Sequence, residues 1–90
     1  MRVEIRLTTI AMKWMDNSWS IDTYARTYKG SNDKFIDKWM EQYSGNGIER
    51  AKVIENQDTV IYCDTFSDLE KIGKKILEIN PKVNTTILDY

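Results

Sequence analysis

Residues 2–14, RVEIRLTTIAMKW, decide the fold. In the first half of this stretch, Val3, Ile5 and Leu7 alternate with polar residues, which is the two-residue period of a strand that buries one face. In the second half the apolar side chains move to even positions: Ile10, Met12 and Trp14. This change of phase predicts either a β-bulge near residues 8–9 or an exchange of the buried face along one strand.

A turn and a second strand follow directly. Residues 15–18, MDNS, have turn chemistry, because Asp and Asn side chains bond to nearby backbone groups and tolerate tight geometry. Residues 19–27 then show strand character. We therefore predict a β-hairpin over residues 2–27.

The rest of the chain alternates helix and strand signals. Ser31 or Asn32 is a helix cap, and Gly45 and Gly47 end that helix. Ser67 and Glu70 form a capping box that begins a second helix. The expected elements are a helix over 31–43, strands over 48–55 and 59–63 with a turn over 56–58, a helix over 67–79 and a strand over 83–90.

The order ββαββαβ predicts one α+β domain over residues 1–90. Its natural form is a mixed, mainly antiparallel sheet with two helices on one face. From residue 19 onward the order resembles the βαββαβ order of ferredoxin-like domains. In that fold the strand over 19–27 is internal, which leaves no place beside it for residues 2–14. We favour the hairpin because it is local, and a ferredoxin-like variant is the alternative.

Composition limits the partners and the compartment. The chain is 41% hydrophobic and 30% charged with a net charge of −1, which is typical of a folded globule and argues against a strongly basic nucleic-acid binder. One cysteine excludes an internal disulfide. The N-terminus has no signal-peptide core, and the longest apolar run, residues 60–63, is far shorter than the roughly 20 residues of a membrane span. We expect a cytoplasmic protein without a membrane partner.

Catalytic signals are weak. The chain has no histidine, and no phosphate-binding loop, dinucleotide fingerprint or nucleophile elbow is present. Cys63, with Asp64 and Thr65, lies between a strand and a helix, but a lone cysteine that ends an apolar run is usually a small core residue. We expect a protein that is not an enzyme and holds no cofactor and no metal.

Two helix faces carry repeated charge. Asp33, Asp37 and Glu41 recur every four residues on the first helix, and Lys71, Lys74 and Lys75 form a basic stripe on the second. Either stripe can recognise a partner of opposite charge. We interpret both as solvated faces, because exposed charge is the usual state of a helix surface.

The hairpin is the candidate binding surface. Trp19, Tyr24, Arg26 and Tyr28 lie on its second strand or next to it, and Tyr, Trp and Arg are over-represented at interface hot spots. The same residues also suit a stacking surface for single-stranded nucleic acid. The alternative is that the aromatic residues pack as cross-strand pairs in the core.

These observations favour a small non-enzymatic binding protein that recognises another macromolecule, and a protein is the partner that we favour. Inhibitors and adaptors are the expected classes, including inhibitors of host defence from phages or mobile elements, such as anti-CRISPR proteins. A nucleic-acid-binding module is the second hypothesis, and a subunit of a small oligomeric enzyme or ligand-binding protein is the third. An N-terminal strand at a sheet edge also predicts a homodimer.

Overall fold

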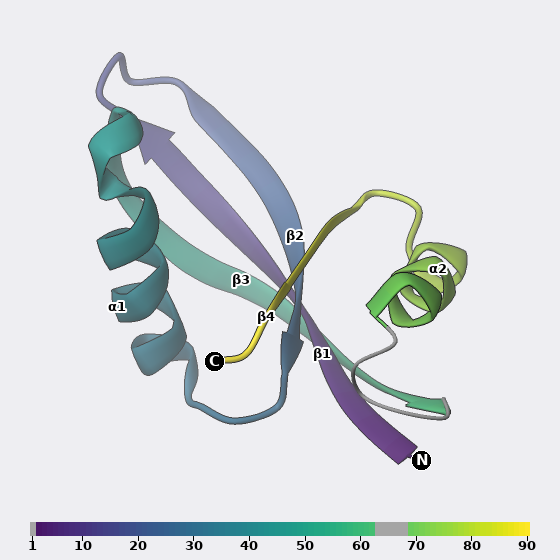
Figure 1. The fold of residues 1–90 in the computed structure, drawn as a ribbon. Helices are drawn as coiled ribbons and strands as arrows, with labels where there is room; N and C mark the ends of the chain where they lie inside the picture. Colours follow the sequence, from purple (N-terminus) through teal and green to yellow (C-terminus); the bar gives the residue numbers. More distant parts are fainter. Residues whose placement is uncertain (1, 63–68) are drawn as a thin grey trace.

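The computed structural model describes residues 2–62 and 69–90, whose fold is shown in Figure 1. The sheet has four strands in the order β3-β1-β2-β4, and β4 runs parallel to β2 while the other neighbours are antiparallel. An α+β fold with a mixed sheet and two helices is therefore confirmed. The elements are β1 (Arg2–Trp14), β2 (Trp19–Thr27), α1 (Asn32–Tyr43), a 3-10 turn (Ser44–Asn46), β3 (Ile48–Tyr62), α2 (Leu69–Ile79) and β4 (Val83–Leu88).

The predicted hairpin of β1 and β2 is present, with a continuous register from Ile5 opposite Thr27 to Lys13 opposite Trp19. Asp16 accepts hydrogen bonds from the backbone and hydroxyl of Ser18, and Asn17 has a φ of 71°. The conflict with a ferredoxin-like order is resolved in favour of the hairpin, because β1 occupies the place beside β2.

Residues 48–62 form one strand where we expected two. β3 pairs with β1 along its whole length, including Asn56 opposite Thr8 and Asp58 opposite Arg6, so the turn predicted over 56–58 is wrong. The long β1 supplies pairing partners beyond this point, and an edge strand tolerates the polar residues because their side chains are exposed. β1 itself has no bulge near residues 8–9, because its register with β2 is continuous there, so the alternative of an exchanged buried face is the correct one. A bulge lies in β3 instead, where Ile54 is the extra residue.

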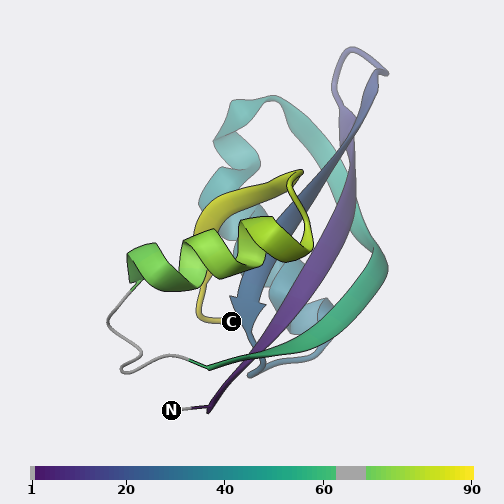
Figure 2. The ribbon, with the colours of Figure 1, turned by 90° about the vertical axis from the view of Figure 1, so that its right-hand side faces the viewer.

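The two helices cover opposite faces of the sheet, which corrects the expectation of two helices on one face (Figures 1 and 2). β1 exchanges its buried face halfway along. Val3, Ile5 and Leu7 pack under α2. Ile10 and Met12 pack under α1 with Phe35 and Trp39. Each helix covers one half of one face, so among residues 2–62 and 69–90 no helix lies on the other half of either face.

β1 is a central strand, so the premise of the predicted homodimer is wrong. The edges of the sheet are β3 and β4. In the described ranges 2–62 and 69–90, neither helix is long and apolar enough to span a membrane.

Candidate binding surface

The four predicted binding residues do not lie on one surface. Trp19 and Tyr28 are each 52% exposed, whereas Tyr24 is 6% exposed and Arg26 is 1% exposed. Tyr24, Arg26 and Tyr28 do share a sheet face, but α1 covers that face over Tyr24 and Arg26. These three side chains are therefore not exposed together, and the alternative of core packing holds for Tyr24.

Tyr24 belongs to the aromatic core beneath α1. Its ring centroid lies 6.1 Å from that of Trp39, edge to face, and 6.4 Å from that of Tyr43. Burial, with the charge of Asp22 as a smaller cause, raises the pKa of Tyr24 to about 12. The phenol is therefore neutral and serves packing.

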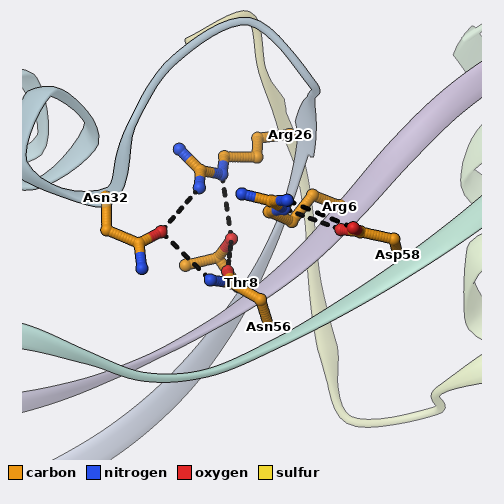
Figure 3. A network of polar contacts seen from close by, with 6 residues as sticks. All are labelled: Arg6, Thr8, Arg26, Asn32, Asn56 and Asp58. Carbon is orange, nitrogen blue, oxygen red and sulfur yellow. Dashed lines mark hydrogen bonds and ion pairs between the residues drawn. The ribbon is translucent and has the colours of Figure 1, made fainter.

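Arg26 holds a closed ring of side-chain hydrogen bonds, shown in Figure 3. Its Nε donates to Thr8 Oγ1 at 2.9 Å, and its Nη2 donates to Asn32 Oδ1 at 2.9 Å. Thr8 donates to Asn56 Oδ1 at 2.8 Å, and Asn56 Nδ2 donates to Asn32 Oδ1 at 3.0 Å. Asn32 is the first residue of α1, so the ring joins the start of this helix to β1, β2 and β3.

The charge of Arg26 is buried and forms no ion pair with any described residue. The guanidinium carbon lies 4.5 Å from the ring centroid of Phe35, and Nη1 has no hydrogen-bond partner within residues 2–62 and 69–90. Burial, together with the nearby charge of Arg6, lowers the pKa of Arg26. Arg26 therefore positions α1 and cannot reach a partner as an exposed anchor.

Tyr28 lies at the other end of the same face, beyond α1. The guanidinium carbon of Arg6 lies 3.9 Å from the centroid of the Tyr28 ring. Arg6 also donates two hydrogen bonds to the carboxylate of Asp58, from Nε at 2.6 Å and from Nη2 at 3.1 Å. This contact raises the pKa of Arg6 and lowers the pKa of Asp58. One face of the Tyr28 ring is therefore covered, and the charges of Arg6 and Asp58 already pair with each other. A pocket of about 300 Å³ lies beside Tyr28 and Asp58.

Trp19 lies on the opposite face, in the half that α2 leaves uncovered. Residues directly opposite each other on paired strands point to the same side of a sheet. Two rows therefore cross β2, β1 and β3 on this side, and we call them together the Trp19 face. The rows are Trp19, Lys13 and Arg50, and Ile21, Ala11 and Lys52.

The centre of the Trp19 face is hollow. Ala11 lies between two larger side chains and is 7% exposed, and a pocket of about 290 Å³ is lined by Ala11, Trp19, Arg50, Ala51 and Lys52. Ile21 beside it is 67% exposed, and the Arg50 guanidinium carbon lies 5.6 Å from the Trp19 ring centroid. The face thus combines an apolar hollow with an aromatic ring and a cation.

Positive charge surrounds this hollow. Lys13 contacts Glu49 at 3.7 Å, while Arg50 and Lys52 form no ion pair with any residue that the structure describes. Two cations are therefore available to a bound anion. The basic stripe of α2 is less available, because Lys74 contacts Glu70 at 3.7 Å and Lys75 Nζ donates to the carbonyl of Tyr62.

Of the residues on this face, only Trp19 was predicted from the sequence, and Ile21, Arg50 and Lys52 were not. Ile21 carried a usable signal, because the hairpin register places it on the face opposite Ile10 and Met12. Arg50 and Lys52 carried none, since their place depends on the pairing of β1 with a strand far along the chain.

No group of three or more histidine, cysteine or carboxylate side chains in the described part of the chain could hold a metal ion. Cys63, with Asp64 and Thr65, lies outside the described residues, as does Ser67 of the predicted capping box. No family model, curated protein or solved structure matches this chain.

Proposed function

We propose that this protein binds another protein through the Trp19 face. The observation that carries the proposal is the apolar hollow over Ala11, which lies between the exposed Trp19 and two cations that form no ion pair with the residues that the structure describes. Interface hot spots are enriched in Trp and Arg and concentrate around such pockets. An inhibitor or adaptor is the class of protein that fits this arrangement.

The surface also indicates what the partner presents. A pocket of about 290 Å³ accepts an apolar side chain, which would displace water from Ala11 and the ring of Trp19. Carboxylates around that side chain would pair with Arg50 and Lys52. We expect an acidic partner surface with one protruding apolar residue.

A protein suits this face better than a nucleic acid. Proteins that bind single strands stack successive bases on several aromatic rings. The Trp19 face has one ring, and Arg50 already lies near it. Tyr28 lies on the opposite face, where Arg6 stacks on its ring. The exposed side chain of Ile21 adds apolar area to the face, but it has no ring on which a base could stack.

Affinity capture from the native host with mass spectrometry tests the proposal. The bait is the whole protein, compared with Ile21→Asp and with the control Ile79→Asp, which places the same charge on an exposed apolar residue of α2. Burying an unpaired carboxylate in an interface is costly, so Ile21→Asp should lose the partner and Ile79→Asp should retain it.

Two results would contradict the proposal. One is a partner that both variants retain equally. The other is a nucleic acid, recognised by loss of the retained material after nuclease treatment and by affinity that falls steeply with salt.

A further inference from the structure

β3 is an edge strand with an open outer side. Among the described residues no strand pairs with it beyond β1, so its outward amide and carbonyl groups have no strand partner there. Most of its side chains are exposed. An edge of this kind is a template on which another chain can add a strand.

A groove runs beside this edge. It has a volume of about 570 Å³ and lies between the first two turns of α1 and residues 51–53 of β3. Ile36, Ala51 and Val53 are half-buried and form its apolar part, and Asp33 and Asp37 stand on the helix side. The groove therefore has an extended backbone along one wall and a helix along the other.

The helix wall is negatively charged. Asp33 and Asp37 belong to the acidic stripe of α1, and neither forms an ion pair within the described residues. Glu41 continues the stripe but does not line the groove. Two carboxylates are thus free to meet a cation that lies against the edge of β3.

We propose that the outer edge of β3 at residues 50–53 receives an extended segment of a partner protein as an added strand, with a lysine or arginine of that segment placed between Asp33 and Asp37. Strand addition at a sheet edge obtains affinity from backbone hydrogen bonds and selectivity from alternate side chains. Every second side chain of the added strand faces α1, where it meets these carboxylates and Ile36.

A second copy of the chain does not suit this site. Two β3 edges paired antiparallel in one continuous sheet would set α1 beside its own copy, with both acidic walls facing one another. The same arrangement would place Arg50 and Lys52 next to their copies on the other face. Repulsion between like charges opposes both contacts.

The test uses a short peptide of alternating valine and lysine, with the same peptide carrying glutamate instead of lysine as its control. Amide resonances and amide hydrogen exchange of the whole protein are followed during titration. We expect the lysine peptide to slow exchange within residues 50–53 and to bind about tenfold more tightly than the glutamate peptide.

Matched variants locate the site. Asp33→Asn combined with Asp37→Asn should weaken the lysine peptide about fivefold, while Glu41→Gln, on the same stripe outside the groove, should leave its affinity unchanged. Trp19→Ala should also leave it unchanged, so this site fails or succeeds independently of the Trp19 face.

Three results would overturn the inference. The first is exchange within residues 50–53 that the lysine peptide does not slow. The second is equal affinity for the lysine and glutamate peptides, or an affinity of the Asp33→Asn and Asp37→Asn double variant for the lysine peptide that equals that of the natural protein. The third is protection of the same amides by self-association before any peptide is added.

Discussion

Tyr24 is buried in the aromatic core beneath α1, where a phenolate would lose hydration. Burial raises the pKa of Tyr24 to about 12 from an ordinary value of 10.0. The folded protein therefore keeps this proton at pH values at which the unfolded chain releases it. The resulting stability is complete below pH 10 and is lost as the pH rises toward 12.

Denaturant unfolding of the protein and of Tyr24→Phe across this alkaline range measures the effect. The free energy of unfolding of the natural chain should fall relative to that of Tyr24→Phe, since the variant has no phenol to ionise. Parallel curves for the two proteins would mean that the Tyr24 hydroxyl lies in water and that α1 does not cover it.

Arg26 shows why the candidate site was only partly predictable. The two-residue period of a strand places Tyr24, Arg26 and Tyr28 on one face, but which part of that face is covered depends on how α1 packs against the sheet. The hairpin register sets Tyr24 opposite Thr8, on the same side of the sheet as Ile10 and Met12. That apolar pair marks the side that α1 covers.

At the scale of the element, α2 carries a glycine that its packing does not require. Gly73 lies in the middle of α2, and a Cβ built on it meets no atom within 4 Å. Glycine costs about 1 kcal/mol relative to alanine in a helix interior. Gly73→Ala should therefore raise the free energy of unfolding by about 1 kcal/mol in urea denaturation.

Gly47→Ala is the control for Gly73→Ala, because the same substitution should here lower the stability. Gly47 has a φ of 84° where the chain passes from the 3-10 turn into β3, and this conformation is strained for alanine. This variant should lose about 1 kcal/mol of stability. A loss of stability in Gly73→Ala would show instead that α2 lies closer to its neighbours than the structure places it.

Local chemistry predicted the elements better than their arrangement. Alternation over residues 2–14 and the turn residues 15–18 were enough for the hairpin, and the glycines after Tyr43 were enough for the end of α1. The continuity of β3 was missed because Asn56, Gln57 and Asp58 are typical turn residues. In the folded chain they are ordinary positions of an edge strand, and only the length of β1 reveals it.

At the scale of the whole molecule, the change of phase in β1 determines both the core and the open surfaces. It places one helix on each face and, in the described part of the chain, leaves half of each face without a helix. On the face that carries α1, the uncovered half lies beside Tyr28, and there Arg6 and Asp58 already form an ion pair. The Trp19 face has a hollow and two cations without an ion pair to any described residue, which is why we assign partner binding to it.

The most direct test of this assignment is calorimetric titration of the captured partner with Trp19→Ala and Tyr28→Ala. Both residues are aromatic and 52% exposed, and they lie on opposite faces of one sheet. Truncating a central aromatic anchor costs about 2 kcal/mol or more, so Trp19→Ala should raise the Kd about thirtyfold while Tyr28→Ala leaves it nearly unchanged. Natural affinity in Trp19→Ala, or an equal loss in Tyr28→Ala, would contradict the assignment.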